Sequence, residues 1–300
     1  MKAGYVSLIG RPNVGKSTLL NSLLGQKISI VSKKPQTTRN RIVGIKNLRG
    51  PTEGGCGQIV FLDTPGIQYG KKLLNQALKK RALTCLKGVD VVLHIIEPLS
   101  DDIRDENPIM AELRKIQVPI LLAINKVDTL KNKSVLLPLM EGYHRIGLYR
   151  EIIPISALRG DGLDRLQASL VNLCPEGERL FPEDMVTEET ERFLVQEIIR
   201  ESLFENTFEE IPYATAVTVE SFEEQPEKNL IRIRAIIYVE RSSQKGIVIG
   251  RRGSMLKKIG SQARREIEAL LGSKVFLDLW VKIWEGWTDD PTALKDFGYI

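Results

Sequence analysis

The residues from Gly10 to Ser17 have the types and spacing of a phosphate-binding loop. They read Gly-Arg-Pro-Asn-Val-Gly-Lys-Ser, which fits a glycine, four residues, and then Gly-Lys-Ser/Thr. Glycines let the backbone curl so that its N–H groups point inward, and a following helix start adds partial positive charge. We expect Lys16 to reach the outer phosphates of a nucleotide and the Ser17 hydroxyl to hold Mg²⁺. The residues expected to line the phosphates are Gly10, Arg11, Pro12, Asn13, Val14, Gly15, Lys16, Ser17 and Thr18.

A strand and a helix must hold this loop in place. Residues 5–9 are apolar enough for a short buried strand, and residues 18–24 are typical of a helix that Gly25 closes. A glycine-rich turn that matches the motif by chance would lack one of these elements.

A second group, Asp63-Thr64-Pro65-Gly66, follows the apolar run 59–62. A carboxylate at a strand end can hold a magnesium-bound water, and the Gly66 N–H is placed to sense a γ-phosphate. We expect Ile67, the next residue, to line the nucleotide site together with this group. Taken alone, the tetrapeptide would also fit an ordinary Pro-Gly turn.

A third group, Asn125-Lys126-Val127-Asp128, indicates which base is bound. The Asp128 carboxylate can accept hydrogen bonds from both N1–H and the N2 amine of guanine, whereas adenine would leave it unpaired. Asn125 would contact N7 and brace the loop, and the Lys126 stem would cover the ring. A fourth group, Ser156 and Ala157, follows strand 152–154, and we expect the Ala157 N–H to donate to guanine O6. Taken alone, this group would suggest only a strand-to-helix turn.

These groups, in this order, resemble the GTP-binding domain of the translation-factor-like GTPases over roughly the first 170 residues. The resemblance implies a threonine that binds Mg²⁺ and the γ-phosphate, and its position favours Thr38, with Thr37 as the alternative. Ser17, Thr38 and, through water, Asp63 would then hold the metal. The bound nucleotides would be GTP and GDP.

The residue that positions the attacking water is not evident. Ras-type GTPases use a glutamine directly after this Gly, but Ile67 stands there and cannot hydrogen-bond water, while Gln68 comes one residue late. The sequence resembles the branch with a hydrophobic residue at this place, some of whose members use K⁺ through an asparagine matching Asn13. The expected catalytic set is Lys16, Thr38, Gly66 and Asn13, with slow intrinsic turnover.

The composition suits a globular chain of about two domains. Its 300 residues include three scattered cysteines, too few for a disulfide framework or zinc site, so we expect reduced thiols in a cytoplasmic protein. No apolar stretch has the length of a membrane span. Strand–helix alternation predicts an α/β domain with a mostly parallel sheet over residues 1–172, a Pro- and Gly-containing linker over 173–185, and a second domain over 186–300.

The second domain carries a Gly-x-x-Gly motif at residues 250–253. The expected order is a helix from Thr190, strands over 214–220 and 230–238, a helix, the loop, a helix over 254–271, and a strand over 275–283. This order resembles the α+β type II KH domain, whose loop holds about four nucleotides of single-stranded RNA. The alternative is a solvated basic helix start. The expected RNA-binding residues are Lys245, Gly246, Ile249, Gly250, Arg251, Arg252, Gly253, Lys257 and Lys258.

Three tryptophans near the end of the chain could stack on bases. We expect Trp280 to pack against the sheet and leave Trp284 and Trp287 open. His94 and His144 are expected to be packing or surface residues.

A GTPase domain joined to a type II KH domain resembles the Era family of bacterial GTPases over nearly the whole chain. The runs at 36–45 and 156–162 strengthen this resemblance, and Gln68 departs from it where family members often have histidine. It implies a monomeric GTP-hydrolysing switch that binds the 3′ end of small-subunit ribosomal RNA and assists maturation of the small ribosomal subunit. The sequence leaves open peripheral contact with the inner face of the cell membrane. The alternative is an RNA-binding scaffold whose nucleotide site is structural; an RNA-modification GTPase would need a further catalytic domain.

Overall fold

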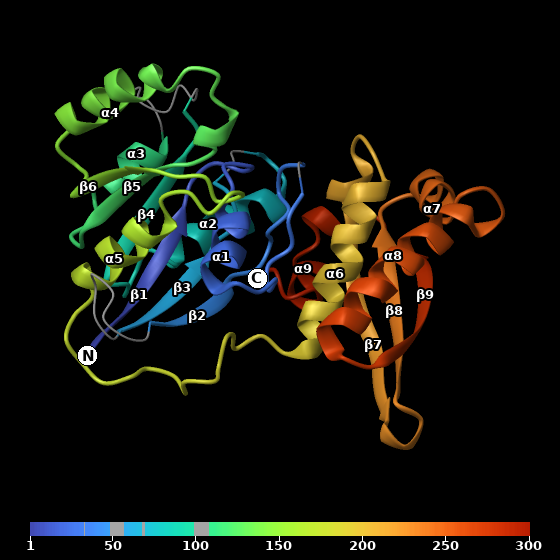
Figure 1. Ribbon diagram of the computed structural model, residues 1–300. Coiled ribbons are helices and arrows are strands. Elements are labelled where there is room, and N and C mark those ends of the chain that lie inside the picture. The colour runs from blue at the N-terminus through green and yellow to red at the C-terminus, as the bar shows by residue number, and fades with distance from the viewer. Residues whose placement is uncertain (33, 49–56, 68–69, 99–107) are drawn as a thin grey trace. The chain divides into compact units, whose positions relative to one another are not determined.

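A computed structural model describes residues 1–32, 34–48, 57–67, 70–98 and 108–300 (Figure 1). Contacts between residues group the chain into two compact units. The first unit contains Met1–Ser29, Thr38–Tyr69 and Leu78–Glu188. The second contains Ile30–Thr37, Gly70–Ala77 and Glu189–Ile300. We describe each unit by itself.

The first unit is built on a six-stranded sheet with the strand order β2-β3-β1-β4-β5-β6. All neighbouring strands are parallel except β2 and β3, which pair antiparallel. The strands are β1 (Lys2–Ile9), β2 (Ile42–Leu48), β3 (Gly57–Asp63), β4 (Val91–Ile96), β5 (Ile120–Ile124) and β6 (Glu151–Pro154). The expected α/β class with a mostly parallel sheet is confirmed.

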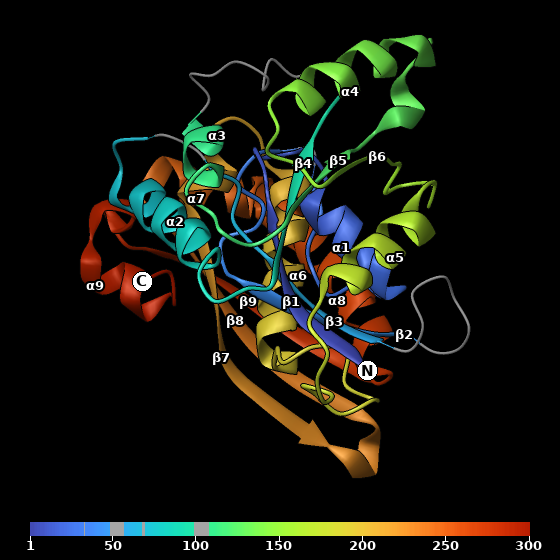
Figure 2. The ribbon, with the colours of Figure 1, turned by 90° about the vertical axis from the view of Figure 1, so that its left-hand side faces the viewer.

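Helices cover both faces of this sheet, so every residue of β3, β4 and β5 is buried. In Figure 2, α1 and α5 lie on one side of the sheet, and α3 and the end of α2 on the other. The helices are α1 (Lys16–Leu24), α2 (Leu73–Thr84), α3 (Pro108–Leu113), α4 (Leu136–Arg145) and α5 (Leu163–Leu173). The loops after β1, β3, β5 and β6 meet at the carboxyl ends of their strands, and they carry the four nucleotide-binding groups.

The segment predicted as a linker, 173–185, is fastened to the first unit. The buried Gln58 side chain on β3 accepts hydrogen bonds from the N–H groups of Leu180 and Phe181, at 2.8 and 2.9 Å. The Ala3 N–H donates to the carbonyl of Pro175 at 3.0 Å. The grouping of contacts accordingly extends the first unit to Glu188.

The second unit has a three-stranded sheet with the order β7-β8-β9, in which β7 and β8 pair antiparallel and β8 and β9 pair parallel. Its elements are α6 (Glu191–Asn206), β7 (Thr215–Gln225), β8 (Leu230–Val239), α7 (Ser242–Ile249), α8 (Ser254–Leu271), β9 (Lys274–Ile283) and α9 (Pro291–Asp296). This is the expected order of a type II KH domain. β7 continues five residues beyond the predicted strand end at 220, with a bulge between Val219 and Ser221.

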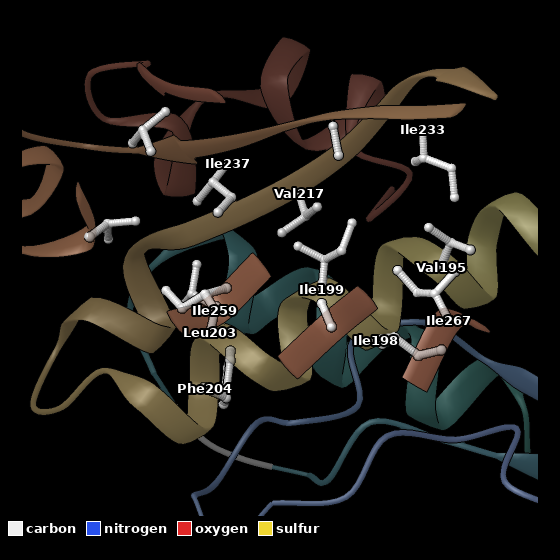
Figure 3. Packing of buried hydrophobic residues seen from close by; sticks show 14 of the residues in the cluster. Val195, Ile198, Ile199, Leu203, Phe204, Val217, Ile233, Ile237, Ile259 and Ile267 are labelled. Carbon is white, nitrogen blue, oxygen red and sulfur yellow. The ribbon is translucent and has the colours of Figure 1, made fainter. Parts of the chain in front are cut away.

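One face of this sheet packs on α6 and α8. Side chains at helical spacing on the two helices meet alternate side chains of the strands, and Figure 3 shows Val195, Ile199, Ile259 and Ile267 facing Val217, Ile233 and Ile237. Thr190 caps α6 by accepting a hydrogen bond from the Phe193 N–H at 3.2 Å. Within α6, the buried pair Glu197 and Arg200 is joined by a hydrogen bond of 2.8 Å from Nε to Oε1.

The segment Ile30–Thr37 is bonded to α6 within the second unit. The Val31 N–H donates to Glu201 Oε1 at 2.8 Å, and Lys34 Nζ donates to the carbonyl groups of Phe204 and Thr207. Lysine at a helix C-terminus satisfies carbonyl groups that have no partner in the helix.

No helix among the described residues is long and apolar enough to cross a membrane. Cys85 and Cys174 are free thiols and buried, in keeping with the expectation of reduced thiols, and Cys56 lies outside the described residues.

Candidate nucleotide and RNA sites

The loop between β1 and α1 has the backbone that its glycines permit. Gly15 has φ +95°, and a Cβ atom there would lie 2.3 Å from Asn125 Nδ2. A Cβ on Gly10 would lie 2.4 Å from the carbonyl oxygen of Ile95. Both positions therefore require glycine, because any side chain would displace a neighbouring segment. Asn13 also has positive φ, at 66°.

Lys16 lies at the first turn of α1 with its side chain folded over the loop. Its Nζ donates to the carbonyl oxygens of Gly10 and Arg11 at 3.1 and 2.9 Å. Burial lowers the pKa of Lys16 to about 8, and the negative charge of Asp63 opposes this shift. An ammonium group held in this way is poorly solvated, so an added phosphate would be a strong partner for it.

The residues expected at the metal lie together. The hydroxyl groups of Ser17 and Thr38 are 2.8 Å apart, and Ser17 Oγ donates to Asp63 Oδ2 at 2.7 Å. Burial raises the pKa of Asp63, while Lys16 and the hydroxyl donors oppose that shift. Asp63 Oδ1 is buried without a hydrogen-bond partner among the described residues.

These oxygens fit Mg²⁺, which binds carboxylate and hydroxyl oxygens and keeps several waters. Ser29 also reaches this cluster, since its Oγ donates to Asp63 Oδ2 at 3.0 Å. Ser29 is not among the residues predicted from the sequence. The side chain of Asn21 fixes it by accepting from the N–H groups of Ile28 and Ser29 at 3.0 Å each.

Thr38, and not Thr37, lies beside the metal residues. The Thr37 hydroxyl donates instead to the carbonyl of Lys34 at 2.8 Å. On the other side of the site, Gly66 lies so close to Pro12 that a Cβ would be 2.7 Å from its nitrogen. Ile67 is 4% exposed and belongs to the apolar core of the first unit. Gln68 lies outside the described residues.

Asn125 joins three of the loops. Its Nδ2 donates to the carbonyl of Val14 at 2.8 Å, and its Oδ1 accepts from the Ala157 N–H at 2.9 Å. The bracing role expected for Asn125 is therefore present in the structure. The Ala157 N–H, which is expected to donate to guanine O6, donates to Asn125 Oδ1 in this structure.

Asp128 and Lys126 are held by their neighbours. Ser156 Oγ donates to Asp128 Oδ1 at 2.6 Å, which fixes the orientation of the carboxylate. Lys126, in a left-handed conformation, donates to the Asn13 carbonyl at 2.5 Å and also to Glu97. Its stem thus extends from the third loop to the phosphate loop.

The remaining predicted nucleotide residues belong to the same loops. Thr64 is buried and donates through Oγ1 to the Leu8 carbonyl at 2.8 Å, which fixes the end of β3 to β1. Arg11 is exposed at the rim, and Thr18 is half-buried in the first turn of α1. Pro65 lies between Thr64 and Gly66, at the carboxyl end of β3.

The Gly-x-x-Gly loop lies between α7 and α8, as expected. Gly250 has φ +74° and ψ 171°, and a Cβ there would lie 2.7 Å from the Met255 nitrogen. Gly253 has φ +76°, with open space around it. The loop ends at the N-terminus of the long helix α8, where backbone N–H groups favour an anion.

The cations expected to bind RNA surround this loop. Arg251 and Arg252 are exposed between the two glycines, and within the described part of the chain neither makes an ion pair. Lys257 and Lys258 are exposed on the first turns of α8. Lys245 is half-buried and Gly246 exposed on α7, while Ile249 packs against the core.

The tryptophans differ from the expectation. Trp280 is 56% exposed, so the prediction that it packs against the sheet is wrong. It stands on the outer face of β9, where the alternation of the strand places it. Trp287 is fully buried, so it has no face free for a base. Trp284 packs edge-on against Tyr238 and Phe297.

The two histidines are outside the site chemistry, as expected. His94 is buried on β4, and its Nδ1 lies 2.8 Å from the Tyr149 hydroxyl. Burial lowers the pKa of His94 to about 3, with a further contribution from Lys16. His144 is exposed on α4.

Comparison with known proteins supports both domains. Residues 5–126 match the family model described as 50S ribosome-binding GTPase, and residues 210–288 match the KH domain model. The chain is 52% identical to GTPase Era of Geotalea daltonii over 297 residues, which cover 99% of this chain and 97% of that one. It is 44% identical to GTPase Era of Coxiella burnetii, again over 99% of this chain and 97% of that one.

Two solved structures are similar over the full length. One is a variant of Aquifex aeolicus Era bound to GDP and AlF4⁻, with a TM-score of 0.94 and 40% identity. The other is Era in complex with MgGDPNP and nucleotides 1506–1542 of 16S ribosomal RNA, with the same TM-score and identity. In both comparisons the alignment covers 100% of this chain and 99% of the other.

Proposed function

Because this chain belongs to the Era family of GTPases, we propose that it is a GTP-hydrolysing switch that binds small-subunit ribosomal RNA. The RNA is bound near its 3′ end through the KH domain, and the switch assists maturation of the small ribosomal subunit. One solved relative holds MgGDPNP and nucleotides 1506–1542 of 16S ribosomal RNA, and we carry these ligand classes to this chain. The observation that carries the proposal is Asn125, which joins the phosphate loop to the guanine loop.

Mg²⁺ would be held by Ser17, Thr38 and, through water, Asp63. Their oxygens already form one cluster, and Asp63 supplies a buried oxygen without a partner. When bound, the ion would neutralise negative charge that develops during phosphoryl transfer. Lys16 adds a buried positive charge on the phosphate side, which stabilises the same developing charge.

Guanine would be recognised by Asp128, which Ser156 holds in one orientation. A carboxylate accepts two hydrogen bonds from the N1–H and N2 amine of guanine, and adenine offers no such pair. The Lys126 stem would cover the base. Replacing Asp128 with asparagine exchanges one acceptor for a donor, so the variant should prefer xanthosine over guanosine nucleotides.

Intrinsic hydrolysis should be slow, because the buried Ile67 cannot orient water. The phosphate-loop and switch N–H groups, with Lys16 and the Gly66 N–H, would carry transition-state stabilisation. Asn13 would ligate K⁺ once Thr38 closes over the phosphates. Equal turnover in potassium and sodium buffers would exclude this role of Asn13.

Nucleotide state would reach the RNA-binding unit through the chain around Thr38. Lys34, four residues before Thr38, is bonded to the end of α6, so ordering of Thr38 by a γ-phosphate acts on a segment fixed to that helix. In the RNA site, Arg251, Arg252, Lys257 and Lys258 would neutralise phosphates. The logarithm of RNA affinity should then fall with the logarithm of salt concentration with a slope of about −3 for four cations.

The protein would act as a monomer in the cytoplasm. Any contact with the cell membrane would be peripheral, at the inner face of that membrane.

Titration calorimetry with GTP, GDP and ATP tests the nucleotide assignment, and equal affinity for ATP would refute it. The Lys16→Ala variant separates the switch from the scaffold alternative. A switch loses the difference in RNA affinity between GTP-analogue and GDP conditions, whereas a scaffold keeps one RNA affinity in both.

A further inference from the structure

The outer face of the sheet in the second unit carries two large exposed aromatic side chains. Phe276 and Trp280 are each 56% exposed, although apolar side chains of this size are usually covered. They alternate with Leu277 and Leu279, which pack against the core on the opposite face. The exposed rings therefore belong to a surface of their own, which we call the outer face.

The rings are held in place by polar neighbours. Trp280 Nε1 donates to Asp278 Oδ2 at 3.0 Å, and Arg234 lies 3.4 Å from the same oxygen. The guanidinium of Arg232 stands over the Phe276 ring at 5.6 Å from its centroid. A ring fixed in this way loses little freedom when a ligand stacks on it.

The charge of the outer face is positive along β8 and β9. The alternation of these strands directs four cations outward against one carboxylate, and these five residues are Arg232, Arg234, Lys274, Lys282 and Asp278. The acidic Glu223 lies on β7, opposite Arg232 in the register and away from β9. The cations are thus gathered toward the edge strand, where Phe276 and Trp280 stand.

This edge strand packs, through its inner face, against the helix that follows the Gly-x-x-Gly loop. A Cβ on Gly260 of α8 would lie 3.3 Å from Leu279 of β9, so the helix that begins at the loop packs directly on that strand. The outer face is covered near Tyr238, which pairs with Lys282 and packs against Trp284 and Phe297. The open part runs along β9 from Trp280 toward Lys274.

We propose that the outer face is a second RNA-binding surface, on which bases of single-stranded RNA stack against Trp280 and Phe276 after the strand leaves the Gly-x-x-Gly loop. Aromatic rings flanked by cations suit single-stranded nucleic acid, because every base has a face for stacking and every nucleotide a phosphate. The proposal rests on the RNA-binding function proposed above and extends it beyond the roughly four nucleotides that a KH loop holds.

Length-dependent binding tests this surface. Affinities are measured by fluorescence anisotropy with labelled random-sequence RNA pools of four and of twelve nucleotides, on the full chain with a GTP analogue. Base stacking on one aromatic ring contributes enough that Trp280→Ala should weaken binding of the longer RNA by about 10-fold or more. The same variant should leave binding of the shorter RNA unchanged, and Trp280→Phe should restore most of the loss.

Control variants separate the outcomes. Arg251→Glu should weaken both RNAs, and Phe208→Ala, which removes a 69% exposed ring outside the outer face, should change neither. If the wild type binds neither RNA, the proposed RNA function fails. If it binds both and Trp280→Ala binds the longer RNA like wild type, the second surface alone is refuted. If instead Trp280→Ala changes only the sedimentation coefficient of the free protein, the face joins copies of this chain, and the proposal is again refuted.

Discussion

Removing the Asn125 side chain should destabilise the first unit even without nucleotide. Both ends of its amide satisfy buried backbone groups, the Val14 carbonyl at 2.8 Å and the Ala157 N–H at 2.9 Å. A residue that only contacts the base would not matter in the empty protein. The Asn125→Ala variant therefore separates bracing of the loops from recognition of guanine.

The magnitude follows from the two groups left unpaired. A buried donor or acceptor without a partner costs about 1–3 kcal/mol, so the loss of both should lower the free energy of unfolding by roughly 4 kcal/mol. With a urea dependence of about 2 kcal/mol/M, this is a shift of about 2 M in the midpoint.

The positions of the tryptophans provide an internal control. All three, Trp280, Trp284 and Trp287, lie in the second unit, so their fluorescence follows that unit, whereas far-UV circular dichroism follows both. In nucleotide-free urea titrations, we expect the dichroism midpoint of Asn125→Ala to fall. The fluorescence midpoint should stay in place if the units unfold separately and should fall with it if they unfold together.

A matched variant is Asn132→Ala, which removes an exposed asparagine that accepts only from the Ser134 N–H at 2.9 Å. Its midpoint should move by the equivalent of about 1 kcal/mol or less. If Asn125→Ala shifts neither probe by more than this control, the bracing role is refuted, whatever the variant does to GTP affinity.

Three further substitutions test other features. His94 is neutral in the folded protein because burial lowers its pKa to about 3, whereas the unfolded chain takes up a proton near pH 6.5. The free energy of unfolding should therefore fall by about 1.6 kcal/mol from pH 6.5 to 5, and the His94→Gln variant should lack this loss in urea titrations. Gly253→Ala should lower the stability of the second unit, followed by fluorescence, by about 1 kcal/mol, because the new Cβ would lie in open space. Gly250→Ala should cost more because its Cβ would meet Met255 of α8, and equal costs for the two variants would contradict this contact. Arg200→Met should cost about 3–5 kcal/mol because it leaves Glu197 charged and buried. The double variant Glu197→Leu/Arg200→Met should recover much of this loss by chemical denaturation, and a double variant as unstable as the single would argue against the ion pair.

The elements and loops that hold the nucleotide groups could be predicted because their signals are local. A glycine pattern between an apolar strand and a helix fixes both the loop and its neighbours, and α8 begins and ends at the predicted residues, 254 and 271. Residues that are distant in sequence gave no such signal. Ser29 reaches Asp63 across 34 positions, and only the folded chain brings them together.

Two errors have a physical explanation. The bulge and the run of glutamates in β7 conceal its second half, since they weaken the alternation that marks a strand. The expected packing of Trp280 against the sheet is wrong because its place between Leu279 and Val281 directs it to the other face. On a strand, alternation is the stronger guide to burial than hydrophobicity.

The burial of Ile67 limits how this enzyme could change during evolution. Its side chain is packed with Leu62 and Val92 in the apolar core of the first unit, so glutamine at this position would bring an amide into that core. A single codon change would thus cost stability before it produced a residue able to hold the attacking water. Faster turnover is more accessible through a group supplied by an external partner, and the rate of hydrolysis can then depend on whether that partner is present.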